Sequence, residues 1–317
     1  MAFPTDAVGA QTVTTNAVFI PELWSDDVIA AYKKNLVVAN LVTKINHVGK
    51  KGDTIHIPKP GRGSANAKAA TAVVTLNTDT ATEVSLSIDK HYEYSRLIED
   101  IAGVQSIDSF RGFYTNDAGY ALAKQVDDDL IKQLEGLNGG TVQAAGSETW
   151  ATAVIGGDGS TAYVDTTTGN SSTLTDAGIR RMIQTLDDAD VPQTERYLII
   201  PPVERNTLMG LPRFTEQAFV GEVGPGNTIR NGMIGDLYGI QVYVTSNAFA
   251  HVSADTTTQH RVGALLHKDA IVHIEQMSVR SQTQYKQEFL ADLFTADTLY
   301  GVGELRDDAG VAFVVPA

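Results

Sequence analysis

Cysteine is absent from the 317 residues, so a disulfide framework, a thiolate metal site and a cysteine nucleophile are all excluded. No apolar run approaches the ~20 residues needed to span a bilayer, and the first residues lack the basic and apolar segments of a secretory signal. Positive charge is also scarce, since 24 Lys and Arg residues against 38 Asp and Glu residues give a net charge of −14. Broad nucleic-acid binding depends on neutralising phosphates, so this balance argues against it. We expect a soluble chain, made in a cytoplasm, that does not contact a membrane.

Motifs that carry catalysis are missing as well. The sequence contains no GxxxxGK[ST] phosphate loop, no GxSxG nucleophile elbow and no HExxH zinc motif. Gly221–Gly226 is rich in glycine, but its spacing and its proline favour an ordinary loop over a dinucleotide site. His267, His273 and Glu275 come closest to a metal-ligand cluster, and polar surface or interface groups are the favoured interpretation. We therefore expect no catalytic, cofactor-binding or metal-binding residues, and a mixed α/β enzyme is the competing hypothesis.

The stretch Ser106–Leu134 predicts one long amphipathic helix. Its apolar residues recur at steps of three and four, which places them on a single stripe. Ser106 is suited to cap the start, and a run rich in glycine closes the end. The stripe consists of Ile107, Phe110, Tyr114, Ala118, Ala121, Leu122, Val126, Leu130, Ile131 and Leu134. The opposite face, expected to be solvated, carries Asp117, Lys124, Asp127, Asp128 and Lys132.

Two acidic clusters deserve a separate interpretation. Asp127, Asp128 and Asp129 are consecutive, and neighbours about 100° apart on a helix cannot converge on one magnesium ion. A solvated acidic face is therefore favoured, with contact to a neighbouring copy as the functional hypothesis. Asp187 and Asp188 lie at the C-terminus of a predicted helix, where acidic side chains are unfavourable. For these two, a role facing a partner and simple surface charge are both open.

Residues Lys44–Asp89 differ from the rest of the chain in charge and pattern. Alternating residues predict strands over Thr54–Ile57 and Val84–Asp89, separated by a long, weakly apolar middle. Such a two-stranded excursion is marginal alone, and its positive charge is expected to meet an acidic surface of another copy. The alternatives are a solvated hairpin and a nucleic-acid contact, although the aromatic residues typical of the latter are missing. The basic residues expected in the contact are Lys50, Lys51, Lys59, Arg62 and Lys68.

The remaining pattern indicates two subdomains, because a single core rarely grows beyond about 250–300 residues. Residues 1–18 are small and polar and are expected to form an arm held by the body or by a neighbouring chain. Predicted helices cover Glu22–Asn35, Thr175–Ala189 and Glu204–Met209. Predicted strands cover Arg196–Ile200, Gly239–Thr245, Gly263–Leu266, Ala270–Ile274, Phe289–Gly301 and Ala312–Val315. We expect a surface linker over Gly139–Asn170 and a glycine-rich loop over Arg213–Asn231. The last strands are expected to pair beside the long helix. The helices and strands between Thr175 and Thr245 would then form an α/β insertion.

The order of these elements, together with several motifs, resembles the major capsid proteins of tailed bacteriophages with the HK97-type fold. The match is strongest to short-tailed, podovirus-like capsid proteins in the passage from the loop into the long helix. The motifs that carry it are Val84–Asp89, Ile98–Asp100, Phe113–Ala123, Leu130–Leu134, the central-domain strand Gly235–Ser246 and the return strand Gly263–His267. They occur in the family's order over nearly the whole chain.

The resemblance implies an α+β, HK97-type capsid fold with an N-terminal arm, an extended E-loop, a peripheral domain built on a long spine helix, and an axial α/β domain. The implied division is 1–43 for the arm and first helix, 44–89 for the E-loop, 90–170 for the peripheral domain with its spine helix 106–134, 171–250 for the axial domain, and 251–317 for strands that return to the peripheral domain.

The resemblance also implies a structural protein rather than an enzyme. Its copies are expected to form the hexamers and pentamers of an icosahedral phage head, part of the virion, that encloses double-stranded DNA without sequence-specific contact. The expected partners are a separate scaffolding protein, a portal and, in some relatives, a decoration protein. A separate scaffolding protein is expected because no long helical prefix precedes the arm. An encapsulin-like shell around cargo protein is the alternative. One relative cross-links its E-loop covalently, and Lys59 and Lys68 lie in the corresponding loop, but its asparagine and glutamate partners cannot be matched here.

Overall fold

The structure is a computed structural model that describes residues 36–59, 61, 63–71, 73–74, 76, 81–99, 110–140, 155–156, 158–159, 163–164, 169–211, 236–248, 250–252 and 258–317. The expected arm over 1–18, the helix expected over Glu22–Asn35 and the glycine-rich loop Arg213–Asn231 lie outside these residues. In the described helices, no segment is both long enough and apolar enough to cross a membrane.

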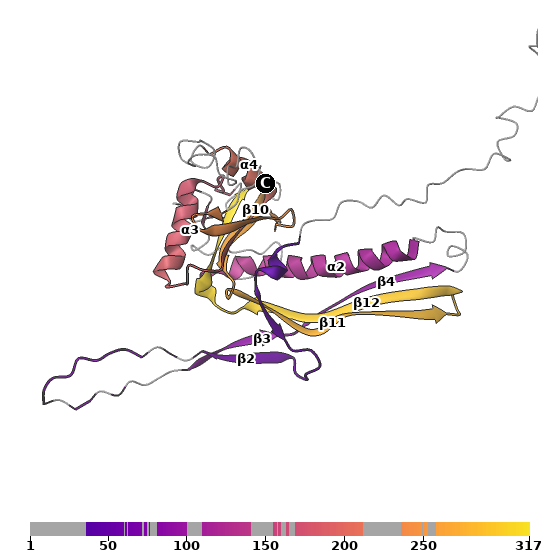
Figure 1. The fold of residues 1–317 in the computed structure, drawn as a ribbon, viewed down its shortest axis with the longest axis horizontal. Helices are drawn as coiled ribbons and strands as arrows, with labels where there is room; N and C mark the ends of the chain where they lie inside the picture. The colour runs from indigo at the N-terminus through magenta and orange to yellow at the C-terminus, as the bar shows by residue number, and fades with distance from the viewer. Residues whose placement is uncertain are drawn as a thin grey trace, which may run out of the picture.

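A four-stranded sheet forms the elongated half of the molecule. Its strands run in the order β1-β11-β12-β4, with β1 parallel to β11 and the other pairs antiparallel. Their bounds are β1 (Thr43–Asn46), β11 (Ile271–Lys286), β12 (Ala291–Glu304) and β4 (Lys90–Glu99). The long helix α2 (Phe110–Lys132) lies along one face of this sheet (Figure 1). Ala118 and Leu122 of the helix pack on Ala296 of β12, because the apolar stripe must be buried against another element.

Helix α2 confirms the long helix predicted from the apolar spacing. Its 23 residues span roughly 35 Å at about 1.5 Å per residue, and a 3₁₀ turn, η3 (Gln133–Gly136), follows it directly. The chain then leaves the helix through Asn138 and Gly139, which both have positive φ, at 59° and 82°. These are the residue types that tolerate left-handed backbone at a helix end. The cap predicted at Ser106 lies outside the described residues.

A seven-stranded mixed sheet forms the second half. Its order is β5-β13-β10-β6-β8-β7, and β9 pairs with β10. The strands are β5 (Ile155–Gly156), β6 (Arg196–Ile200), β7 (Asp236–Leu237), β8 (Ile240–Val244), β9 (Ala250–Val252), β10 (Gln259–His267) and β13 (Gly310–Pro316). Helix α3 (Asp176–Asp188) buries Ile179, Met182 and Leu186 in the core of this half, and α4 (Pro202–Met209) follows β6. The two predicted helices and the predicted strand over Arg196–Ile200 are thus confirmed.

The expected pairing of the last strands is only half correct. β11 and β12 lie beside α2, as expected, but β10 and β13 pair with each other and β10 also pairs with β6 in the second sheet. The residues of β10 from Val262 to His267 are all buried, without alternation. A strand buried on both faces needs the interior of a covered sheet, and the second sheet supplies it. The expected surface linker Gly139–Asn170 also contributes to this core, since Tyr163 is buried against Val262 and Val314.

A long hairpin projects from the end of the first sheet (Figure 1). Its strands, β2 (Thr54–Lys59) and β3 (Thr82–Ser87), are antiparallel, and Thr54 lies opposite Ser87. These are the two strands that alternation predicted for this segment, and the predicted two-stranded excursion is confirmed.

Candidate assembly surfaces

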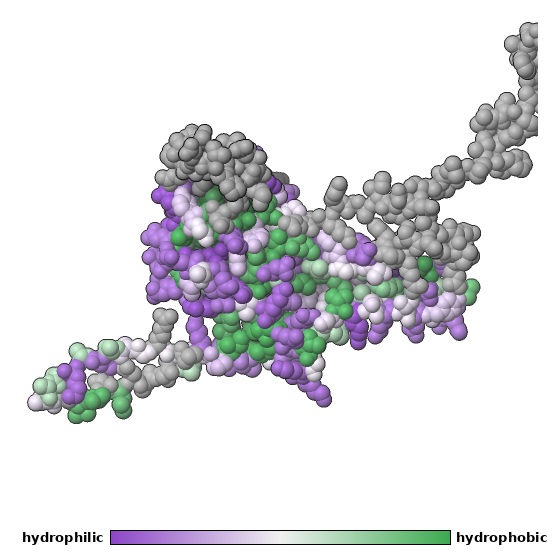
Figure 2. Space-filling model, viewed as in Figure 1, coloured by the Kyte–Doolittle hydropathy of each residue, from purple (hydrophilic) through white to green (hydrophobic). Residues whose placement is uncertain are grey.

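The outer part of the β2–β3 hairpin has no contact that buries it. Every described residue from Lys59 to Thr82 is exposed, including Val73 at 91% and Leu76 at 85% of their accessible surface. Figure 2 shows hydrophobic atoms at the far end of this projection. Exposed apolar side chains gathered in one place mark surfaces that other molecules cover. The hairpin therefore carries a contact surface that its own subunit leaves open.

The base of the hairpin, in contrast, is fixed to the body. Leu86 and Ile88 are buried in a cluster with Val272 and Ile274 of β11. The backbone also approaches β12 closely, because a Cβ on Gly301 would lie 2.4 Å from the carbonyl oxygen of Ser87. This contact needs a residue without a side chain. The base of the hairpin is therefore fixed against β11 and β12, and this sets the direction in which the hairpin projects.

A second set of contacts holds the segment that enters the hairpin. The side-chain amide of Gln276 donates hydrogen bonds to the carbonyl oxygens of Lys50, at 3.0 Å, and Gly52, at 2.8 Å. The N–H of Ile88 donates to the carbonyl oxygen of Asp53, at 2.7 Å. The segment before β2 is therefore hydrogen-bonded to β11, and the segment after β3 is hydrogen-bonded to the segment before β2.

The basic side chains predicted for this segment lie on the exposed surface. Lys50, Lys51, Lys59 and Lys68 are exposed, and the ion pairs found within the described residues involve none of them. Arg62 lies outside the described residues. Lys50 and Lys51 lie in the segment that enters the hairpin, and Lys59 and Lys68 lie on its outer part. These four exposed ammonium groups are ones that a negatively charged surface would complement.

The far end of the first sheet presents a second exposed apolar group. Phe289 and Leu290 occupy the turn between β11 and β12 and are 61% and 62% exposed, and Leu97 of β4 is 49% exposed. Leu290 has a φ of 46°, which an L-residue adopts reluctantly. Sequence reasoning missed this surface, because Phe289 and Leu290 fall within the strand predicted over Phe289–Gly301 and no strand was predicted around Leu97.

The acidic residues of α2 differ in part from the solvated face that was expected for them. Asp127 is fully buried, so the expectation is wrong for this residue. Asp128 pairs with Lys124 on the surface, and Asp129 accepts a hydrogen bond from the hydroxyl of Tyr300 at 2.7 Å. The three carboxylates point to different partners, as predicted from their angular spacing. A group of three potential ligands for a metal ion is not found in the described residues.

Asp127 is buried because it accepts hydrogen bonds from groups distant in sequence. The N–H groups of Val38 and Ala39 donate to one oxygen, at 2.9 and 3.3 Å, and the side-chain amide of Asn247 donates to the other, at 3.4 Å. Burial raises the pKa of the Asp127 carboxyl, and these three hydrogen bonds oppose the rise. The neighbouring hydroxyl of Tyr300 also has a raised pKa, first through burial and then through Asp129.

At the end of α3, Asp187 and Asp188 have different environments. Asp187 accepts a hydrogen bond from the guanidinium of Arg196 at 2.7 Å, and the Arg196 side chain is 2% exposed. This guanidinium also donates to the carbonyl oxygens of Val191 and Pro192. The buried arginine therefore compensates the unfavourable acid at the helix C-terminus. Asp188 is exposed.

The histidines singled out in the sequence do not form a metal site. His267 is buried and accepts a hydrogen bond from the N–H of Asp269 at 3.2 Å. His273 packs on the ring of Tyr300, with 5.6 Å between ring centroids, and burial lowers the pKa of its imidazole. His267 is buried and His273 is half-buried against Tyr300, so the interpretation of these histidines as polar surface or interface groups is wrong for His267.

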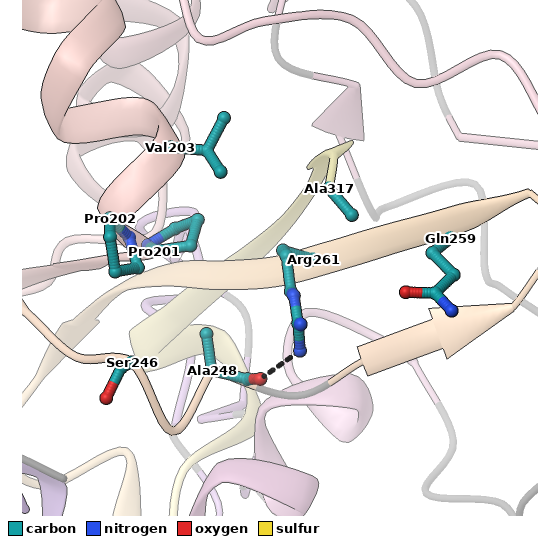
Figure 3. Close-up of a pocket in the computed structure, with 8 residues that line it drawn as sticks. All are labelled: Pro201, Pro202, Val203, Ser246, Ala248, Gln259, Arg261 and Ala317. Carbon is teal, nitrogen blue, oxygen red and sulfur yellow. Dashed lines mark hydrogen bonds between the residues drawn. The ribbon is translucent and has the colours of Figure 1, made fainter.

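A cavity of about 590 Å³ opens beyond the ends of the parallel strands β6 and β8 (Figure 3). Its lining consists of Pro201, Pro202, Val203, Ser246, Ala248, Gln259, Arg261 and Ala317. Arg261 is held by the carbonyl oxygen of Ala248 at 3.3 Å. The lining offers one hydroxyl and one guanidinium, and neither histidine nor an acidic residue belongs to it. An enzyme that works by nucleophilic catalysis needs a nucleophile paired with a general base, and this pair is not assembled in the lining of this cavity.

A body with two outward-facing apolar surfaces and a hairpin whose described lysines are exposed is suited to a structural subunit that is built into a larger assembly. The sequence profile described as phage capsid protein matches residues 22–312, and the chain belongs to this family. None of the curated proteins compared with the chain matches it significantly.

Solved structures support the same fold. The chain is similar to one from Mycobacterium phage Che8, with 22% identity, a TM-score of 0.70 and coverage of 93% of this chain and 97% of that chain. It is also similar to the capsid of the cyanophage P-SCSP1u, with 18% identity, a TM-score of 0.72 and 99% coverage of both chains. The cyanophage Pam1 capsid gives 14% identity, a TM-score of 0.73 and coverage of 98% and 99%. The predicted α+β, HK97-type capsid fold is confirmed, and the chain is a structural capsid protein.

Proposed function

We propose that this chain is the major capsid protein of a tailed bacteriophage, whose copies form the hexamers and pentamers of an icosahedral shell around double-stranded DNA. The observation that carries the proposal is the β2–β3 hairpin, which projects from a fixed base and exposes all its described outer residues. A hairpin of this kind is marginal unless another surface covers it. Neighbouring copies of the same chain provide that surface in a closed shell.

The division of the chain belongs to the same proposal. Residues 44–89 act as the extended loop, 90–170 contain the peripheral domain with its long helix, and 171–250 contain most of the axial domain. β10 pairs with both β13 and β6, which supports placing β10 and β13 in the axial domain, so that only part of 251–317 returns to the peripheral domain. Residues 1–43 supply the arm and the first helix.

The contact between copies is proposed to join the basic hairpin to an acidic surface of the next subunit. Lys50, Lys51, Lys59, Arg62 and Lys68 supply the positive side. Asp188 is exposed and supplies the negative side, together with Asp128, which is half-exposed and already paired with Lys124. Asp127 is used inside its own subunit and is removed from the set. One oxygen of Asp187 already binds Arg196, so only the exposed part of this carboxylate is open to a contact with the next subunit.

Negative-stain microscopy of the purified protein tests assembly directly, and closed shells are the expected result. A variant with Lys50, Lys51, Lys59 and Arg62 changed to glutamate is expected to stay folded but to assemble poorly or not at all. A matched control changes Arg180, Arg181, Arg205 and Lys286 to glutamate, which alters the net charge by the same amount and leaves the hairpin and the Lys124–Asp128 pair unchanged. Normal shells from the hairpin variant would refute the basic contact, and an equal defect in the control would assign the effect to net charge.

An encapsulin-like shell is the second candidate, because it has the same fold. The contents of shells from the native source distinguish the two. Nuclease-protected DNA supports the phage head, whereas enclosed protein without DNA supports the compartment. Uniform shells from this chain expressed alone would show that a separate scaffolding protein is not required, and copurification from infected cells would test the portal and decoration proteins.

A further inference from the structure

The outer half of β11 is exposed along its length. Every residue from Ser278 to Tyr285 is exposed, and Val279 keeps 57% of its accessible surface. The cluster that Ala118 and Leu122 of α2 form on this sheet takes its other residues from β4 and β12. Figure 1 shows the same arrangement, with α2 along β4 and β12 and with β11 at the border of the sheet. Since consecutive residues of a strand point to opposite faces, both faces of this half-strand are open.

The outer edge of the same half-strand is open as well. β11 lies between β1 and β12, but β1 pairs only with Val272–Glu275. After Glu275, none of the described strands pairs with this edge of β11. Alternate residues of an edge strand direct their N–H and C=O groups away from the sheet, where a further strand can bind them. The half-strand is therefore a template to which an extended segment can add by β-augmentation.

Edge strands usually carry features that prevent such pairing, above all charged side chains and proline. Met277–Tyr285 contains no proline and no acidic residue. Its single charged residue, Arg280, donates two hydrogen bonds to Asp297, at 3.0 and 2.7 Å, and this carboxylate balances its charge. A bulge distorts the register with β12 between Glu275 and Arg280, but Arg280–Lys286 pair regularly. The regular part of the edge is therefore without the usual protection.

The charges of the segment favour a second copy of β11 as the strand that covers it. The lysine-rich hairpin is a poor match, because Val279–Tyr285 offers no acidic residue to its ammonium groups. Two copies of β11 related by a two-fold axis run antiparallel and use the same open edge on both sides. An axis at Gln282 places Val279 opposite Tyr285 of the other copy, an aromatic and β-branched pair of the kind that stabilises sheets. It also places Arg280 opposite Gln284 of the other copy, so that no like charges meet.

We propose that β11 pairs antiparallel with β11 of a neighbouring copy across a two-fold axis at Gln282. The contact joins the two four-stranded sheets into one continuous sheet and covers the open edge of both copies. β1 is not displaced, because it occupies the edge only up to Glu275. The inference rests on the proposed assembly of identical copies, and it adds a contact that is separate from the basic hairpin.

Disulfide trapping tests the pairing, because the chain contains no cysteine of its own. In Gln282→Cys, the two thiols lie directly opposite each other at the axis, within reach of a disulfide. Mild oxidation of the purified full-length protein is expected to give a covalent dimer as the main band on a non-reducing gel. Ser278→Cys is the matched control on the same strand, because its two thiols would be roughly 27 Å apart. A dimer from neither variant, or equal dimer yields from both, would overturn the proposal.

A charge variant tests whether the contact matters for assembly. Gln282→Lys sets two ammonium groups opposite each other and is expected to reduce the yield of closed shells several-fold. Ser95→Lys, at an exposed position of β4, is the control and should leave that yield unchanged. Undiminished shells from Gln282→Lys would overturn the role of the contact in assembly. Closed wild-type shells without trapped dimers from Gln282→Cys would overturn the pairing and leave the capsid function standing, whereas trapped dimers from a protein that forms no shells would support the pairing and count against the capsid function.

Discussion

Glu304 gives the sharpest prediction about how this subunit responds to pH. It is the last residue of β12, opposite Ile271 of β11, and it is half-buried. Burial raises the pKa of its carboxyl to about 7, and the nearby carboxylate of Asp307 adds to the rise. The ordinary pKa is 4.5. The folded subunit therefore binds a proton at Glu304 more tightly than the unfolded chain does.

The sign and size of the effect follow from this difference. Because the folded state holds the proton more tightly, stability falls as the pH rises from about 4.5 to about 7 and stays low above that range. At about 1.4 kcal/mol per pH unit, the full penalty is ~3 kcal/mol. Glu304→Gln removes the charge without changing the shape, so the variant is expected to be more stable at pH 8 by up to ~3 kcal/mol. The advantage should vanish near pH 4.

Urea unfolding of the unassembled subunit, followed by circular dichroism at several pH values between 4 and 8, measures this effect. A matched control is Glu288→Gln, at an exposed carboxylate in the turn after β11. The control should follow the wild-type curve. If Glu304→Gln and the wild type show the same dependence of the unfolding free energy on pH, the reasoning from burial is wrong.

Two further predictions concern the first sheet. Gly301→Ala places a methyl group against the carbonyl oxygen of Ser87, so the hairpin base should shift and the subunit should lose about 1–3 kcal/mol. Thermal unfolding and faster proteolysis within the hairpin would show it, and wild-type behaviour of both would contradict the close contact. Asp297 accepts two hydrogen bonds from the guanidinium of Arg280, which holds the pKa of that carboxyl below its usual value. The resulting stability is present above the ordinary pKa of about 3.8 and is lost as the pH falls through the lowered pKa of the folded state. Asp297→Asn should therefore unfold at lower urea at pH 7, and its difference from wild type should shrink as the pH falls below about 4. Equal midpoints at pH 7 would argue against the pair.

Much of the fold was predictable from local patterns. The three- and four-residue spacing identified α2 and α3, and strict alternation identified β2 and β3. The cap at Thr175 is also a local signal, since its hydroxyl accepts from the N–H of Gly178 at 3.1 Å. In each case, the residues that determine the structure lie within a few positions of one another.

The errors have a common physical origin. Asp127 has the position of a solvated acid on α2, yet it is buried by backbone groups 88 and 89 residues away. Nothing in its neighbours along the helix indicates those donors. β10 and β13 read as ordinary late strands, and only their burial on both faces decides that they join the second sheet. The candidate surfaces show the same limit, because the turn at Phe289 carries no sequence signal of its exposure.

The sequence by itself determined the helices α2, α3 and α4, the strands β2, β3 and β6, the absence of any recognised catalytic motif, and the unusual positive charge of the hairpin segment, because these depend on composition and on neighbours along the chain. Only the tertiary structure decided which sheet each late strand enters, which acid of α2 is buried, and which apolar side chains are left exposed. Those outcomes depend on contacts between residues far apart in sequence, and burial of a polar group is tolerated only where such distant partners satisfy it.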